Sequence, residues 1–248
     1  MDKALHLSIV IPAYNEAARL PATVDAVLEA VAVWPHTTEL ILVDDGSTDA
    51  TGRIISEIAA ARDGVTPVIL RDNRGKGGAI AAGVAASRGE FVLFFDADLS
   101  YPLEAVPDAL GRLESGADVV IGARDLEPSN GRASYSPLRN ATSLAFNAFV
   151  EVVLRLGIHD TQCGFKAFRG EVARELFPTL AVRGFGFDVE LLFAARRRGC
   201  AIALMPIRME DRAGSSVRVL RHGIQMARDV MRVRVRGWMG RYKKAPTR

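Results

Sequence analysis

The strongest constraint on the fold is a regular alternation of short apolar runs and helical patterns along the first half of the chain. The apolar runs predict strands at residues 7–11, 39–45, 65–72, 89–98 and 117–124. Between the strands, the spacing of apolar residues predicts helices at residues 16–34, 48–61, 75–87 and 101–116. Continuous apolar strands separated by helices are typical of a mostly parallel sheet with helices on both faces, so we expect an α/β fold.

The second half of the chain is more mixed. It contains helical patterns at residues 136–157, 170–180 and 186–199, a polar loop with a short strand at 160–168, and a strand at 200–209. No linker rich in Pro, Gly and Ser separates the two halves. We therefore expect one domain over residues 1–217, in which the second half covers a crevice formed by the first.

Polar side chains follow the predicted strands at the points where these strands end. They are Asn15 and Glu16 after the first strand, Asp44 and Asp45 after the second, Asp96 and Asp98 after the fourth, and Arg124 after the fifth. In open parallel sheets, ligands bind beyond the carboxyl ends of the strands. We expect these four loops to converge on one binding crevice.

Asp96 and Asp98 are candidates for a metal site. Residues i and i+2 of a strand point to the same side, so both carboxylates would face one cation if the strand end stays extended. Mg²⁺ or Mn²⁺ suits one or two carboxylates, with water and substrate phosphates in the remaining positions. The alternative is a turn with two solvated aspartates, and a motif this short does not decide between the two.

Charge is distributed unevenly along the chain. From Arg218 onward there are ten Lys or Arg residues and one acid, Asp229, so this segment carries +9 and residues 1–217 carry −6. Apolar residues recur at helical spacing within residues 218–248, at Leu220, Ile224, Ala227, Met231, Val235, Trp238 and Tyr242. The pattern predicts a basic amphipathic helix that docks on an anionic membrane surface. Packing on the domain with a solvated basic face and nucleic-acid binding are the alternatives.

Two features bear on location. The N-terminus lacks the apolar core and cleavage site of a signal peptide, and uncharged runs are shorter than the roughly 18–20 apolar residues that span a bilayer. Cys163 and Cys200 have neither metal-ligand spacing nor a disulfide framework, which fits a reducing compartment. We expect a cytoplasmic protein that is peripheral on the cytoplasmic face of a membrane. We expect no nucleic-acid partner, because the converging acids would repel phosphate.

Longer motifs carry a resemblance to a known family. The first half contains IPAYNEAARL, LVDDGSTDAT, NRGKGGAIAAGVAASRGEFVLFFDADLS and VIGAR, and the second half contains DTQCGFKAF and GFGFDVELL. In these motifs, and in their order, the chain resembles glycosyltransferase family 2, whose members bind nucleotide sugars on a GT-A (Rossmann-like) fold. The stretches DTQCGFK, FDVELL and HGIQMARDVMRVR look most like dolichyl-phosphate β-glucosyltransferases, and the dolichyl-phosphate mannose synthases are related.

The resemblance implies roles for the motif residues. Residues 1–125 would bind the nucleotide sugar and residues 126–217 the acceptor. The residues that would contact the nucleotide sugar are Pro12, Ala13, Tyr14, Glu16, Asp44, Asp45, Lys76, Asp96 and Ala97. A metal would be held by Asp96 and Asp98, and the acceptor phosphate by Arg124, Arg139 and Ser143. The residues that would act in catalysis are Asp98, Asp160, Asp188 and Arg212.

Some positions qualify these roles. For Asp44 and Asp45, a plain turn is the alternative to binding uracil or ribose. Asp160 and Asp188 would orient the sugar or the attacking group, and Arg212 would close over the diphosphate. Ser100 stands where mannose synthases often carry a metal-binding glutamine. In the loop that carries Arg212, Val217 stands where a lysine often follows the residues GS or GES.

The reaction implied is the transfer of glucose from UDP-glucose to a polyprenyl (dolichyl-type) phosphate, with Mg²⁺ or Mn²⁺ as cofactor. A phosphate monoester has a second pKa of about 6, so the acceptor is already largely a dianion at neutral pH and needs no strong base. A single displacement would invert an α-linked donor to a β-linked product. The alternatives are a mannose synthase that uses GDP-mannose, and a family 2 enzyme with a soluble or polysaccharide acceptor.

Overall fold

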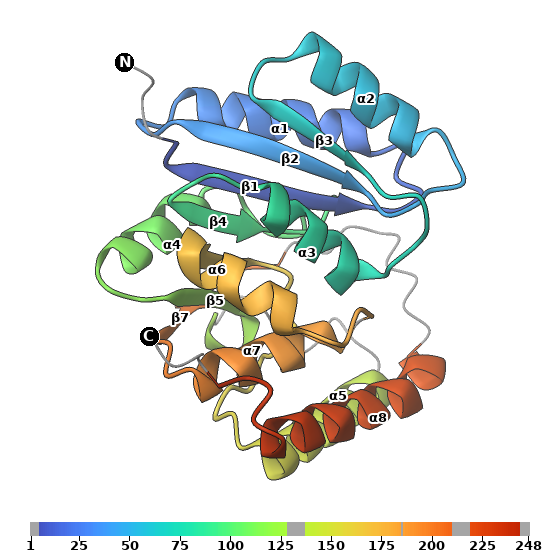
Figure 1. The fold of residues 1–248 in the computed structure, drawn as a ribbon, viewed down its shortest axis with the longest axis vertical. Coiled ribbons are helices and arrows are strands. Elements are labelled where there is room, and N and C mark those ends of the chain that lie inside the picture. The colour runs from blue at the N-terminus through green and yellow to red at the C-terminus, as the bar shows by residue number, and fades with distance from the viewer. Residues whose placement is uncertain (1–4, 128–136, 185, 210–218, 244–248) are drawn as a thin grey trace.

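The computed structural model describes residues 5–127, 137–184, 186–209 and 219–243, with side chains at all of these except 137–144 and 219–224. The described residues form one sheet of seven strands with flanking helices (Figure 1). The expected α/β fold with a mostly parallel sheet is therefore confirmed. None of the helices described has both the length and the apolar composition that a membrane span requires.

The sheet draws strands from both halves of the chain. The strands are β1 (Leu7–Ala13), β2 (Thr38–Asp44), β3 (Val65–Ile69), β4 (Phe91–Phe94), β5 (Val119–Ala123), β6 (Lys166–Arg169) and β7 (Ile202–Pro206). Their order across the sheet is β3-β2-β1-β4-β6-β5-β7. All neighbours are parallel except β6, which runs antiparallel to β4 and to β5. The second half of the chain therefore does more than cover a crevice, because β6 separates two strands of the first half.

Helices cover the sheet and extend beyond it. They are α1 (Leu20–Ala32), α2 (Thr51–Ala61), α3 (Lys76–Ala86), α4 (Ala105–Glu114), α5 (Pro137–Leu154), α6 (Gly170–Leu176), α7 (Phe187–Arg197) and α8 (Val219–Trp238). Short 3-10 helices lie at Arg124–Leu126 and Phe177–Thr179. α3 packs on β1 and β2 and also contacts α6 and α7. α5 and α8 lie side by side, at the end of the molecule away from β2 and β3 (Figure 1).

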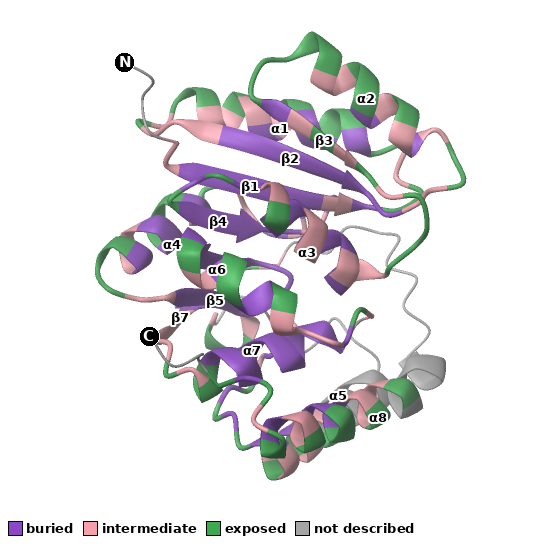
Figure 2. Ribbon diagram, in the orientation of Figure 1, coloured by how far each residue is buried: buried purple, intermediate pink, exposed green. Residues whose placement is uncertain are grey.

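The apolar runs of the sequence form the centre of the sheet. β1, β2, β4 and β5 are almost wholly buried, as their continuous apolar character requires (Figure 2). At the end of β4, Phe94 packs among Phe168, Phe177 and Phe187, with ring centroids 5.9–6.3 Å apart. These aromatic contacts hold the second half of the chain against the strand end that carries Asp96.

The C-terminal helix α8 packs on the domain. It contacts α5 and α7, and buries Val230 and Val233, while Tyr242 beyond it is also buried. The Tyr242 hydroxyl donates a hydrogen bond to Glu190 of α7 (2.5 Å). Arg236 lies 3.4 Å from the same carboxylate and donates to the Thr179 carbonyl (2.9 Å). One face of α8 is thus fixed by apolar burial and by a buried polar cluster.

Candidate active site

The polar residues predicted from the strand ends gather at one edge of the sheet. β1 and β2 run in register, so that Ala13 lies beside Asp44 at their carboxyl ends. β4, next to β1, leads directly to Asp96, and β5 leads to Arg124. The parallel strands therefore bring these loops to the same side of the sheet, as expected.

The two aspartates after β4 lie in a turn. β4 ends at Phe94 rather than continuing to Asp98, and Leu99 has a positive φ of 49°. The Leu99 N–H donates to the Asp96 carbonyl (3.2 Å), and the Ser100 N–H donates to the Asp98 carboxylate (3.0 Å). The expectation of an extended strand through this motif is wrong, because these hydrogen bonds stabilise a turn instead.

Both aspartates nevertheless remain partly exposed. Ala97 and Leu99 are buried, whereas Asp96, Asp98 and Ser100 are partly exposed. Buried and partly exposed residues therefore alternate along this turn, as they would along a strand.

Lys76 is the nearest cation to the aspartate pair in the described structure. Its Nζ lies 2.6 Å from Oδ1 of Asp96. Gly75, with φ of +76°, and Gly77 permit this placement, because a Cβ at either would lie within 2.7 Å of atoms in Arg183 or Phe187. The glycines around Lys76 thus let the start of α3 approach the segment between Arg183 and Phe187 closely. Burial lowers the pKa of Lys76, but the carboxylates of Asp96 and Asp188 outweigh burial and raise it.

Gly164 leaves room for the other carboxylate oxygen of Asp96, and the sequence did not predict this role. A Cβ at Gly164 would lie 2.5 Å from Oδ2 of Asp96 and 3.3 Å from the Tyr101 ring. The Gly164 N–H donates to the Tyr101 hydroxyl (3.2 Å). Any side chain at this position would displace the Asp96 carboxylate. The only signal in the sequence is a glycine within the polar loop DTQCGFK, which by itself indicates a turn.

A buried ion pair lies close to Asp96 and Lys76. Lys166 and Asp188 are 0% and 4% exposed, and Nζ of Lys166 lies 2.5 Å from the Asp188 carboxylate. The same ammonium donates to the Cys163 carbonyl (2.6 Å). Burial raises the pKa of Asp188, whereas Lys166 and Lys76 lower it by less. Asp188 is therefore buried and paired with Lys166, and its role in catalysis stays a prediction.

Tyr14 and Glu16 follow the carboxyl end of β1. Tyr14 is 46% exposed, which leaves its ring available for stacking. The Glu16 N–H is held by the Thr51 hydroxyl (2.9 Å). Burial raises the pKa of the Glu16 carboxyl; Arg19 lowers it, and the negative charges of Asp98 and Asp96 raise it further. Glu16 therefore lies within electrostatic range of both aspartates, where a bound cation would relieve the repulsion.

Asp44 and Asp45 are buried and have local partners. Asp44 accepts a hydrogen bond from the Ser47 N–H (3.1 Å), which is the turn contact given above as the alternative. Asp45 accepts from the Arg74 N–H (2.7 Å), and burial raises its pKa. These contacts couple the end of β2 to the loop before α3, and so help to place Lys76. Pro12 and Ala13 form the adjacent end of β1.

Arg124 and Asp160 are brought together as a pair. Arg124 donates two side-chain hydrogen bonds to Asp160, at 2.7 and 2.8 Å, and its backbone N–H donates a third at 2.9 Å. Burial raises the pKa of Asp160, but the hydrogen bonds from Arg124 outweigh burial and lower it. Arg124 is thus oriented by Asp160, while one third of its side chain stays exposed.

Three predicted residues fall outside the described side chains. Arg139 and Ser143 belong to the first turns of α5, where the structure describes the helix but not the side chains. Arg212 lies in the segment 210–218, which the structure does not describe. Their roles stay predictions.

The aspartate pair fits a hard divalent cation as a partial ligand set. Carboxylate oxygens are ligands that Mg²⁺ and Mn²⁺ prefer. Within the described residues, no third carboxylate or imidazole lies close enough to complete a three-ligand group with Asp96 and Asp98. Two protein carboxylates are what such an ion uses when the remaining positions belong to water and a diphosphate.

Comparison with known sequences gives consistent matches over most of the chain. Residues 8–177 match the family described as Glycosyl transferase family 2. The dolichyl-phosphate beta-glucosyltransferase of Dictyostelium discoideum is 35% identical over 251 residues, which cover 96% of this chain and 77% of that protein. The human protein of the same name is 34% identical over 255 residues, which cover 98% and 79% respectively.

Solved structures agree on the fold. The mannosyl-3-phosphoglycerate synthase of Rubrobacter xylanophilus superposes with a TM-score of 0.69 at 21% identity, covering 96% of this chain and 76% of that one. The glucosyl-3-phosphoglycerate synthase of Mycobacterium tuberculosis, solved with Mn²⁺, UDP-glucose and phosphoglyceric acid, gives 0.62 at 25% identity, covering 96% and 80%. With strand ends, acidic turn and sequence all in agreement, the chain belongs to glycosyl transferase family 2 and is a glycosyltransferase of the GT-A fold.

Proposed function

We propose that this glycosyltransferase moves glucose from UDP-glucose to a polyprenyl phosphate of the dolichyl type, with inversion to a β-linked product. The observation that carries the proposal is the 35% identity, over 96% of the chain, to a protein named for dolichyl phosphate and glucose. The solved neighbours named for phosphoglycerate are 21–26% identical, which favours the lipid acceptor over a soluble one.

On the donor side, Asp96 and Asp98 would hold the metal, and Tyr14 and Glu16 would contact the nucleotide. The Mn²⁺ bound with UDP-glucose in the mycobacterial structure supports a divalent ion of this kind. When bound, the ion would neutralise the diphosphate and so stabilise the leaving nucleotide. Lys76 adds a second positive charge beside Asp96, fixed by the close approach of α3. Together these charges offset the negative charge that develops on the leaving group.

On the acceptor side, the chain must bring one anion towards another. Arg124, oriented by two hydrogen bonds from its guanidinium to Asp160, presents a planar group suited to a phosphate. Because the acceptor is already ionised at neutral pH, the site needs charge and orientation rather than a strong base. Attack from the face opposite the leaving diphosphate gives the β-linked product.

We also propose that α8 docks the enzyme on an anionic membrane. Met231, Val235, Trp238 and Met239 are each 45–71% exposed, whereas Val230 and Val233 of the same helix are buried. Exposed basic residues flank them, at Arg228, Arg232, Arg241 and Lys243, and Arg234 stacks over the Trp238 ring at 5.0 Å. An apolar strip bordered by arginines suits the headgroup region of an anionic bilayer. The predicted location on the cytoplasmic face stays a prediction.

The catalytic proposal is tested with purified protein, Mn²⁺ or Mg²⁺, a panel of UDP- and GDP-sugars, and either polyprenyl phosphate or 3-phosphoglycerate. We expect a glucolipid from UDP-glucose only, lost with EDTA or with Asp98→Asn. Asp108→Asn is the matched control, because Asp108 is an exposed acid of α4 that pairs with Arg112. Transfer of mannose, or transfer to phosphoglycerate alone, would contradict the proposal.

The membrane proposal is tested by sedimentation with liposomes that contain anionic lipid. We expect Trp238→Ser with Met239→Ser to weaken binding, since each replaces an exposed apolar side chain without touching the core. Val33→Ser is the control, because Val33 is 82% exposed but lies at the end of α1, away from α8. Equal binding by all three proteins would refute the role of α8.

A further inference from the structure

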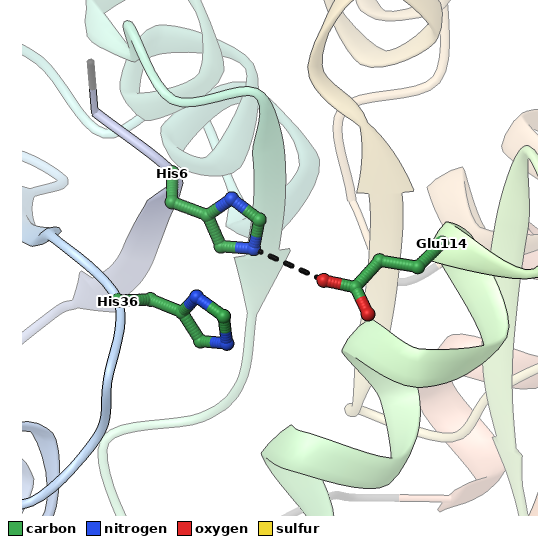
Figure 3. Close-up of side chains that lie close together, drawn as sticks. All are labelled: His6, His36 and Glu114. Atoms are coloured by element: carbon green, nitrogen blue, oxygen red, sulfur yellow. Dashed lines mark ion pairs between the residues drawn. The ribbon is translucent and has the colours of Figure 1, made fainter.

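Three side chains with metal-binding atoms meet at the end of β1 that is remote from the candidate active site. His6 directly precedes β1, His36 lies in the turn between α1 and β2, and Glu114 is the last residue of α4. Each offers one ligand atom, and these atoms all lie within 4.8 Å of one another. Figure 3 shows the two imidazoles side by side, with the Glu114 carboxylate facing them from the end of α4.

The ring of His6 is firmly placed. It stacks on His36 with centroids 4.1 Å apart and meets the edge of Phe91 at 5.0 Å. Its Nδ1 lies 3.3 Å from the Glu90 carboxylate, and its Nε2 lies 3.4 Å from the Glu114 carboxylate. Nε2 is buried, yet makes no hydrogen bond of acceptable geometry with any described residue. A buried ring nitrogen without such a bond needs another partner.

One ligand-to-ligand distance already matches a zinc-type site. A tetrahedral ion with ligand bonds of about 2.0–2.1 Å holds neighbouring ligand atoms roughly 3.3–3.4 Å apart. The separation between Nε2 of His6 and the Glu114 oxygen has this value. A carboxylate on the second ring nitrogen, as Glu90 provides, is the usual outer partner of a metal-bound histidine.

We propose that His6, His36 and Glu114 bind a divalent ion of the zinc type, with water in the fourth position. Two imidazoles and one carboxylate favour Zn²⁺ over Mg²⁺, which prefers oxygen ligands throughout. The rings now stack at 19°, so the His36 side chain must rotate for both nitrogens to point at one ion. The ion joins the start of β1, the α1–β2 turn and the end of α4, and its role is structural.

The test uses tag-free, EDTA-treated full-length protein and Zn²⁺ alone, followed by isothermal titration calorimetry. We expect one ion per chain, and at a hundredfold excess over Kd a rise in Tm of about 5–10 °C. Co²⁺ in place of Zn²⁺ should give the visible absorption of a tetrahedral site. Removing the outer carboxylate with Glu90→Gln should weaken binding about 10- to 100-fold.

Two variants test the ligands themselves. His36→Ala and Glu114→Gln should each lose at least about tenfold in zinc affinity, with circular dichroism showing an unchanged fold. His159→Ala is the control, since His159 is an exposed histidine elsewhere, and Asp98→Asn excludes binding at the active-site acids. Zinc binding that is absent from the wild type, or equal in all variants, would overturn the proposal. Neither result depends on transferase activity.

Discussion

Gly164→Ala tests whether the position of Asp96 matters for catalysis. The added Cβ would lie 2.5 Å from Oδ2 of Asp96, about 0.9 Å short of the 3.4 Å at which ordinary contact begins. β6 begins two residues later and is paired on both sides, so the backbone of Gly164 has little room to retreat. The Asp96 side chain must therefore move by nearly 1 Å.

A displacement of that size is large for a catalytic group. Misplacement by about 1 Å costs on the order of 100-fold in rate, and we expect that loss in glucose transfer. The same shift would disturb the 2.6 Å contact between Asp96 and Lys76, so affinity for Mn²⁺ should change as well. Radiolabelled UDP-glucose measures the rate, and electron paramagnetic resonance of free Mn²⁺ measures the affinity.

Gly111→Ala is the matched control for this substitution. Gly111 lies within α4, and a Cβ there meets nothing within 4 Å. We expect full activity and a gain in stability of about 0.5–1 kcal/mol, because alanine favours the helix. If Gly164→Ala keeps wild-type activity and Mn²⁺ affinity with an unchanged Tm, the Asp96 carboxylate is not positioned as argued.

Three further predictions concern the polar interior and use urea unfolding. Lys166→Met leaves the Asp188 charge buried and unpaired, and should cost about 3–5 kcal/mol; a cost below about 1 kcal/mol would contradict the pairing. Tyr242→Phe removes the hydroxyl bound to Glu190 and should cost about 1–3 kcal/mol, so a neutral effect would argue against the anchoring of α8. Because Arg124 lowers the pKa of Asp160 below its ordinary 3.8, the stabilisation is present above pH 3.8 and lost as pH falls below it. Arg124→Met should flatten this acid dependence, and an unchanged profile would refute the assignment.

Local pattern was sufficient to predict the parallel part of the fold. The apolar runs of β1, β2 and β5 are strands buried on both faces, so their sequence reports their environment directly. The insertion of β6 between β4 and β5 was not predictable in this way. Strand pairing between Phe94 and Lys166 joins residues far apart in the chain, and nothing in either segment specifies the partner or its direction.

The candidate site was predicted only where it depends on local sequence pattern. Asp96 and Asp98 follow a recognisable strand, so their clustering with Glu16 follows from the parallel sheet. The roles of Gly164 and Lys166 depend on contacts made only in the folded chain. Gly164 lies against the Asp96 carboxylate, and Lys166 is wholly buried beside Asp188. A lysine in a sequence is normally read as solvated, and only its partner reveals that it is buried.

The most direct test of the central claim is the product formed from radiolabelled UDP-glucose, Mn²⁺ and dolichyl phosphate. We predict label in the organic phase as a β-linked glucosyl phospholipid, formed by the wild type and by Asp108→Asn but not by Asp98→Asn. Label that stays in the aqueous phase, or an α-linked lipid, would contradict the account of this site.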